Sequence, residues 1–326
     1  MKSVDRALVA MIVLMCGSAF AQGQGSIAYP TKPVRILVGF APGGGIDIVS
    51  RIYAQRLSES LGRSFVVENR PGAGGTIASE LTSNATPDGY TLIMVSVTHS
   101  INASLYPKLP YDTVKSFSAI SPVALQADVI AVHPSVPVKT LRELVALAKA
   151  KPDDLSYAHA GNGTLMHVGM ELFLSMAHIR MLAVPYNGAG PSTLATLAGQ
   201  VPVLSTSLPP SLPYAKAGKL RILAVTTAQR TPLAPDFPAV DEAAGLKGYE
   251  AVVWIGLLGP RGMPAAVVNK LNAEIHRLQQ TPEMKEHLAS QGIDPYHDTP
   301  AGFENVIRND IVKWAKIVRD TGLKAE

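Results

Sequence analysis

The chain has very little cysteine and modest charge. Its 326 residues include one cysteine, Cys16, and 17% charged residues, with a formal net charge of +4 and no basic block. Since Cys16 lies in a segment predicted to be removed, the mature chain would have neither disulfides nor a thiol nucleophile. Phosphate binding needs clustered Lys and Arg, so we expect no nucleic-acid partner. No second long apolar run appears, so we expect a soluble mature protein. We also expect it to be a monomer.

Sequence signatures of common enzymes are also missing. There is no phosphate-binding Gly-Lys-Ser/Thr, no Gly-x-Ser-x-Gly and no His-Glu-x-x-His. The dinucleotide fingerprint fails because Gly43 and Gly45 are followed by Ile48 where a third glycine belongs. These absences favour a protein that is not an enzyme. They predict no catalytic residue, no cofactor and no metal.

The N-terminus has the pattern of a secretory signal. Lys2 and Arg6 precede a short apolar run at 7–15, and Ala19, Phe20 and Ala21 form a small-x-small cleavage site. The sequence therefore predicts a signal peptide at 1–21 and a periplasmic mature chain. One alternative is a cytosolic chain with an apolar N-terminal arm. Another is lipid attachment at Cys16, but Met15 stands where a lipid-attachment site prefers a small residue.

Strand-like and helix-like patterns alternate along the mature chain. This alternation predicts an α/β fold with mostly parallel sheets flanked by helices, more easily built as two lobes than as one. Chain crossings between lobes are expected near 118–126 and 251–260. The expected strands are 34–40, 65–68, 91–97, 128–133, 155–158, 182–184 and 220–225, and the expected helices are 46–61, 76–85, 140–150, 165–177, 192–198, 265–280 and 301–321.

Four glycine-rich turns each follow a predicted strand and precede a predicted helix. They are "APGGGID" (41–47), "RPGAGGT" (70–76), "AGNGT" (160–164) and "YNGAGPS" (186–192). A helix N-terminus has backbone N–H groups without partners and a partial positive charge, and glycine lets a ligand approach them. Each turn alone is more often an ordinary connection. Together, at the carboxyl ends of strands, the four predict a site for a small carboxylate.

Several side chains near these turns have two interpretations. Asp47 either complements the helix dipole or accepts from an ordered water or a ligand amine. His99 either donates to a ligand or is a satisfied structural histidine. Tyr186 either packs or reaches the cleft with its hydroxyl. His167 lies inside its helix and would cap or support the loop before it.

The turns also carry a family resemblance. The segments "YPTKPVRILVGFAPGGGIDIVSR" (29–51), "VVENRPGAGGTIASE" (66–80), "PDGYTLIM" (87–94), "PYNGAGP" (185–191), "AGKLRILAVT" (217–226) and "WIGLLGPRGMP" (254–264) resemble the Bug proteins, the solute-binding components of tripartite tricarboxylate transporters. The resemblance implies a Venus-flytrap fold, with lobe 1 at 29–125 plus 254–326 and lobe 2 at 126–253. It further implies a small organic acid as ligand and a membrane permease as partner; a ligand sensor or an enzyme on the same fold are the alternatives.

The resemblance also implies where the ligand binds. The first glycine turn and the second would approach a ligand carboxylate, partly through ordered waters, and the third and fourth would contact it from the other lobe. Pro202 stands where the family often has an acid, which argues against an amino-acid ligand. His159 would alter ligand choice or face solvent. The predicted ligand-binding residues are Phe40, Ala41, Gly43, Gly44, Asp47, Gly74, Gly75, Ser96, His99, Ala160, Gly161, Thr164, Tyr186, Gly188, Thr206 and Ser207.

Overall fold

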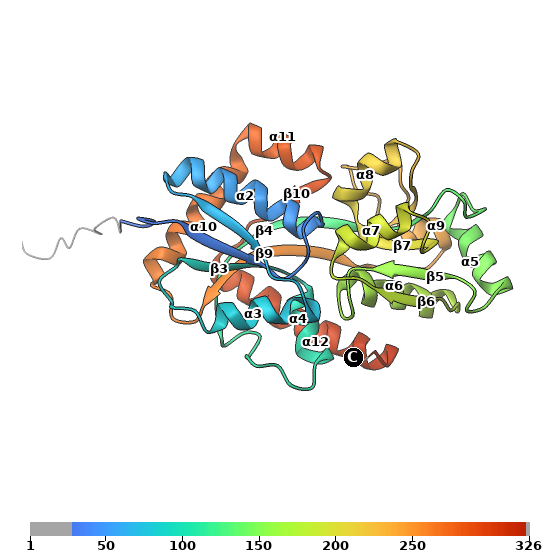
Figure 1. The fold of residues 1–326 in the computed structure, drawn as a ribbon, viewed down its shortest axis with the longest axis horizontal. Helices are drawn as coiled ribbons and strands as arrows, with labels where there is room; N and C mark the ends of the chain where they lie inside the picture. The colour runs from blue at the N-terminus through green and yellow to red at the C-terminus, as the bar shows by residue number, and fades with distance from the viewer. Residues whose placement is uncertain (1–27, 324–326) are drawn as a thin grey trace, which may run out of the picture.

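The computed structural model describes residues 28–323, so the predicted signal peptide lies outside the described residues. Helices and strands alternate along the chain (Figure 1). The strands are β1 (Val34–Val38), β2 (Phe65–Asn69), β3 (Thr91–Ser96), β4 (Phe117–Val132), β5 (Ser156–His159), β6 (Leu182–Pro185), β7 (Val203–Ser207), β8 (Arg221–Val225), β9 (Val252–Pro260) and β10 (Ile293–Pro295).

The helices agree well with the periodicity of the sequence. Those predicted at 165–177 and 265–280 are found with the same bounds, as α6 and α10. The described helices are α2 (Gly45–Leu61), α3 (Thr76–Ser83), α4 (Thr98–Leu105), α5 (Leu141–Ala150), α6 (Leu165–Ala177), α7 (Ala189–Leu197), α8 (Leu208–Lys216), α9 (Val240–Ala244), α10 (Ala265–Gln280), α11 (Pro282–Ser290) and α12 (Pro300–Thr321), with a short 3₁₀ turn at Ala73–Gly75.

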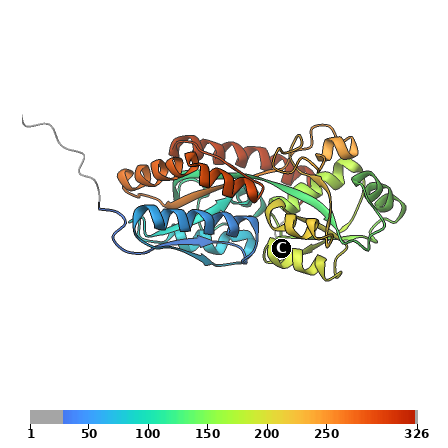
Figure 2. The same ribbon diagram turned by 90° about the horizontal axis from the view of Figure 1, so that it is seen from above.

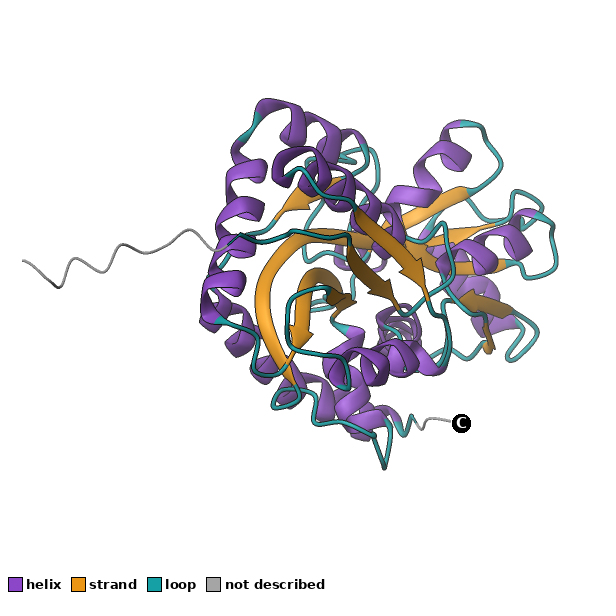
Figure 3. Cartoon of the chain, turned by 60° about the vertical axis from the view of Figure 1, so that its left-hand side comes forward, coloured by secondary structure: helices purple, strands orange, loops and turns teal. Residues whose placement is uncertain are grey.

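Ten strands form a continuous sheet in the order β2-β1-β3-β9-β4-β7-β5-β6, with β8 and β10 also pairing with β4. The predicted parallel pairing holds for β1 with β2 and β3, and for β5 with β6 and β7. In contrast, β4 and β9 pair antiparallel to their neighbours. Helices cover both faces of the sheet (Figures 2 and 3).

Strand β4 joins two groups of elements. Its residues 117–127 pair with β9, and its residues 128–132 pair with β7 and β8. In Figure 1, β4 and β9 run between a group containing α2, α3 and α10 and a group containing α5 to α9. The chain crossings predicted near 118–126 and 251–260 fall in these two strands. The point along β4 at which its pairing partner changes therefore lies between the two groups of elements.

The elements that periodicity did not predict have physical explanations. Helix α8 contains Pro209, Pro210 and Pro213, and the first two stand in the first turn, where a missing N–H costs little. Most residues of the first part of β4 and all residues of β9 after Val252 are buried, so these strands lack the alternation that marks a half-exposed strand. Among residues 28–323, no helix combines the length and apolarity needed to cross a membrane.

Candidate functional site

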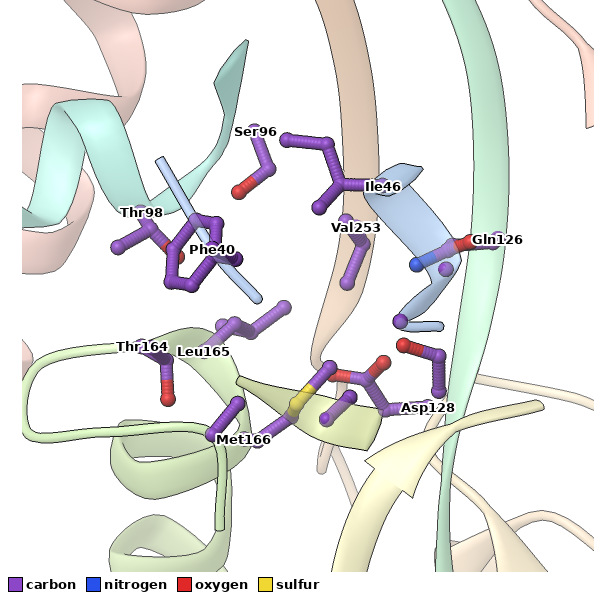
Figure 4. A pocket seen from close by; sticks show the side chains of 15 residues that line it. Phe40, Ile46, Ser96, Thr98, Gln126, Asp128, Thr164, Leu165, Met166 and Val253 are labelled. Atoms are coloured by element: carbon purple, nitrogen blue, oxygen red, sulfur yellow. The ribbon is translucent and has the colours of Figure 1, made fainter. Parts of the chain in front are cut away.

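The N-termini of α2, α4, α6 and α7 and the ends of strands β3 and β7 meet at one pocket between the two groups of elements. We call it the central pocket; its empty space of about 420 Å³ includes a part open to solvent. None of its fifteen lining residues is Lys or Arg (Figure 4). They are Phe40, Gly44, Gly45, Ile46, Ser96, Thr98, Gln126, Asp128, Ala160, Thr164, Leu165, Met166, Ala189, Ser207 and Val253.

The first glycine turn places the N-terminus of α2 at the pocket. Gly43 has a φ of +87°, a conformation that favours glycine, and its N–H donates to Asp47 Oδ2 at 3.0 Å. Gly44 is the N-cap and supplies no side-chain cap. The first helical bond runs from Ile48 N–H to Gly44 O, so the N–H groups of Gly45 and Ile46 have no acceptor within the helix. They can therefore serve an anion.

Asp47 holds this turn in place instead of lining the pocket. Its carboxylate is buried and accepts from Gly43, from Asn69 Nδ2 at 2.9 Å and from two nitrogens of Arg51 at 3.0 Å. Burial alone would raise the pKa of Asp47, but the hydrogen bonds from Arg51, Gly43 and Asn69 outweigh it and hold the pKa below its usual value. Asp47 stands in the first turn of α2, as its predicted role at the helix dipole required, but its hydrogen bonds to Asn69 and Gly43 were not predicted.

Two more helices direct their N-termini at the pocket from the other group of elements. In α6, Thr164 caps the helix by accepting from His167 N–H, and the N–H groups of Leu165 and Met166 remain without an intrahelical acceptor. In α7, the N-cap is Gly188, and the next residue, Ala189, lines the pocket. The positive ends of α2, α6 and α7 thus face one space that is lined by no Lys or Arg side chain.

The pocket should be sensitive to a single added methyl group at Gly45. A Cβ there would lie 2.5 Å from Gln126 Oε1 and 2.8 Å from Ser207 Oγ, so Gly45→Ala should displace both side chains. Alanine is favoured over glycine in a helix, which offsets part of the cost of this displacement to the stability of the fold. We expect ligand affinity to fall about tenfold, measured by calorimetry. An unchanged dissociation constant would show that these side chains are not needed in their present positions.

Three buried polar side chains of the pocket have no hydrogen-bond partner among the described residues. They are Gln126 through Oε1, Asp128 through both carboxylate oxygens, and Ser207 through its hydroxyl. Asp128 is only 2% exposed, and burial raises its pKa well above the ordinary value of a carboxyl group. Leaving such groups unpaired is costly, so each of them calls for a hydrogen-bond partner inside the pocket.

The structure brings six of the predicted residues to the central pocket: Phe40, Gly44, Ser96, Ala160, Thr164 and Ser207. Gly74, Gly161 and Tyr186 line an adjoining pocket that shares Phe40 and Ala160 with the first. Gly75 and His99 border a smaller space that shares Phe40 and Ser96 with it. Phe40 therefore stands at the junction of the three spaces.

The other predicted residues do not line the central pocket. Ala41 and Gly188 lie where the two groups of elements touch, and Ala41 N–H donates to Asn187 O at 2.9 Å. Thr206 points to the opposite face of β7, where its hydroxyl lies 3.1 Å from that of Thr193. Side chains alternate along a strand, so of Thr206 and Ser207 only one can face the pocket.

The buried histidines are structural in their contacts. His99 Nε2 bonds Thr113 O at 2.9 Å, and its ring packs against Tyr111 and Phe117. His167 Nδ1 accepts from Gly163 N–H at 3.2 Å, so it supports the loop before α6 as predicted. His159 does not face solvent: it is fully buried and its ring stacks on that of His167, with 4.4 Å between centroids.

Sequence reasoning missed Gln126 and Asp128, the most polar groups of the pocket. A signal was present, because both interrupt a long apolar segment two residues apart. An acid inside a buried strand is rare enough to indicate function. Within residues 28–323, no group of three or more His, Cys, Asp or Glu side chains is arranged to hold a metal ion.

Two groups of helices on a shared sheet, with a pocket between them, define the α/β fold of periplasmic binding proteins. Solved structures of that class superpose closely. An R. palustris protein, Rpa4515, solved with adipate has a TM-score of 0.88 and 33% identity over 91% of this chain and 99% of its own. MatC from Rhodopseudomonas palustris, with bound malate, has a TM-score of 0.84 and 30% identity over 89% and 100%.

The chain belongs to the tripartite tricarboxylate transporter family of receptors, whose family model matches residues 49–323. Protein BugT of Bordetella pertussis is 31% identical over 324 residues, which is 99% of either chain. The periplasmic binding protein BugD has a TM-score of 0.87 and 30% identity over 91% of this chain and 100% of its own. The protein is therefore a solute receptor of this family, as the resemblance at the glycine turns implied.

Proposed function

We propose that this receptor binds a small carboxylate-bearing solute in the central pocket and delivers it to a membrane permease of the tripartite tricarboxylate type. The observation that carries the proposal is the set of three helix N-termini, of α2, α6 and α7, around a pocket without Lys or Arg. Backbone N–H groups and helix dipoles bind anions in that arrangement. The adipate and malate of the two R. palustris relatives are small carboxylates of the same kind.

The proposal also covers the export of the chain, its oligomeric state and its division into two lobes. Residues 1–21 would direct export to the periplasm and be removed, and the mature chain would act as a monomer. Lobe 1 would comprise 29–125 and 254–326, and lobe 2 would comprise 126–253, with β4 and β9 as the connections. The ligand would be held by both lobes, since Phe40 and Ser96 come from one and Thr164 and Ser207 from the other.

A thermal-shift screen of the mature chain, unfolded and refolded to remove any retained ligand, tests the proposal. The panel would contain aliphatic dicarboxylates, hydroxy acids, amino acids and aromatic acids. A ligand at a hundredfold excess over its dissociation constant should stabilise the fold by about 2.7 kcal/mol. A folded protein whose melting temperature no carboxylate changes would contradict the proposal.

A further inference from the structure

One wall of the central pocket is made of acceptors that no described residue satisfies. Gln126 is 4% exposed, Asp128 2% and Ser207 0%, and all three line the pocket. Within the described residues, Gln126 Oε1, both oxygens of Asp128 and Ser207 Oγ have no hydrogen-bond partner. A buried carboxylate in this state needs either a proton or a cationic neighbour.

Strand geometry places the three side chains together. Gln126 and Asp128 are two residues apart on β4, so they lie on one face. Asp128 pairs directly with Ser207 on β7, and cross-strand partners also share a face. Figure 4 shows Gln126 and Asp128 on the same side of the pocket.

The acceptor wall adjoins the N-terminus of α2. A Cβ on Gly45 would meet the Gln126 amide and the Ser207 hydroxyl at 2.5 to 2.8 Å, so the free N–H groups of Gly45 and Ile46 lie next to the acceptors. The pocket thus offers donors for an anion directly beside acceptors for a cation. The remaining lining is largely apolar, with Phe40, Leu165 and Val253.

A second carboxylate would not fit the acceptor wall well. It would fit only beside a protonated Asp128, because the oxygens of two ionised carboxylates are all acceptors and repel one another. An ammonium group has three N–H donors and a positive charge, which match the oxygens of Gln126, Asp128 and Ser207. With the amine bound, Asp128 can be ionised inside the pocket, because the opposite charge offsets its desolvation.

We propose that the solute is an α-amino acid, with its ammonium group on Gln126, Asp128 and Ser207 and its carboxylate at the N-terminus of α2. The proposal rests on the proposed function, which it narrows to one class of carboxylate. The missing family acid at Pro202 argued against an amino acid, but Asp128 supplies a carboxylate from a different strand. The side chain of the solute lies against the apolar part of the pocket.

The experiment compares ligands that differ only in the amine. Leucine, phenylalanine, aspartate and glutamate would be tested by thermal shift and calorimetry beside their amine-free partners isocaproate, hydrocinnamate, succinate and glutarate, with isoamylamine as the partner lacking a carboxylate. At least one amino acid should bind more tightly than its amine-free partner by about thirtyfold, and isoamylamine should not bind. If an amine-free acid binds as well as its amino acid, the inference fails and the proposed function stands. If no carboxylate binds, both fail.

The isosteric variant Asp128→Asn gives the second readout. It should weaken the amino acid by about thirtyfold and leave an amine-free acid unchanged or improved, because only the ammonium needs the charge. The ligand-free variant should melt at the same temperature or higher, since it removes a buried unpaired carboxyl, and this shows that it folds. Asp236→Asn, at an exposed aspartate, is the matched control. An equal loss for both ligands would mean that Asp128 only shapes the pocket, which contradicts the inference.

Discussion

The free energy of unfolding should fall steeply between about pH 7 and pH 5 because of three buried histidines. Burial lowers the pKa of His99 to about 4, and the hydrogen bond to Thr113 restores only part of the shift. Burial also lowers the pKa of His159 and of His167, and the neighbouring His167 ring lowers that of His159 further. All three rings are therefore neutral in the folded protein at pH 5.

The free energy of unfolding falls as the pH falls because the unfolded chain binds protons at a higher pH than the folded protein does. An unfolded histidine takes up a proton near pH 6.5, whereas these folded ones do so only at much lower pH. Their stabilising effect is thus complete above pH 6.5 and lost as the pH falls toward the folded pKa. At about pH 5 each histidine costs about 2 kcal/mol, or about 6 kcal/mol together. Burial raises the pKa of Asp128, Glu171 and Asp310, which stabilises the fold as the pH falls and offsets part of this loss.

Chemical denaturation of the wild type and of single variants at several pH values measures the contribution of one histidine to this loss of stability. His99→Gln removes one titrating ring, so this variant should lose about 2 kcal/mol less than wild type between about pH 7.5 and pH 5. His178→Asn is the control, because His178 is exposed and its left-handed backbone suits asparagine. Parallel pH profiles for wild type and His99→Gln would mean that the folded His99 ring titrates normally.

Local patterns were enough to predict that the N-termini of α2 and α6 lie at the end of the preceding strands. The turn at 41–47 needed glycine for a positive φ at Gly43, and the apolar period after it located α2, so the helix N-terminus followed directly. The capped start of α6 at Thr164 could be predicted in the same way. These features depend on neighbours within a few residues, which the sequence displays.

The acceptor wall and the role of Asp47 depend on distant partners. Asp47 is held by Asn69 from β2, and no local pattern links the two positions. Gln126 and Asp128 face the pocket because β4 spans both groups of elements and changes partners at this point, a fact of sheet topology. The choice of Ser207 over Thr206 follows from the register of β7 against β4, which a single sequence does not give.

Gly190→Ala should weaken ligand binding by about thirtyfold by keeping the two groups of elements apart. Gly190 lies in the first turn of α7, and a Cβ there would stand 2.4 Å from Pro42 O in the first glycine turn. Ala41 N–H donates to Asn187 O beside this contact. Since Pro42 O and the Gly190 Cα are backbone atoms, no rotamer change can relieve the overlap, and such overpacking costs about 1–3 kcal/mol.

The cost should appear in binding and not in folding. Separation of the two groups of elements would relieve the overlap in the unliganded protein, and Gly190 has a backbone conformation that alanine adopts. The variant should therefore melt like wild type without ligand, bind more weakly by calorimetry, and keep a larger radius of gyration with ligand in X-ray scattering. Ala198→Val, which adds methyl groups at the exposed C-terminal end of α7, is the control. If the variant binds and compacts like wild type, the ligand is held without this contact. If the variant loses both affinity and ligand-induced compaction, the ligand selects the closed form, because apparent affinity falls with the fraction of molecules that can close.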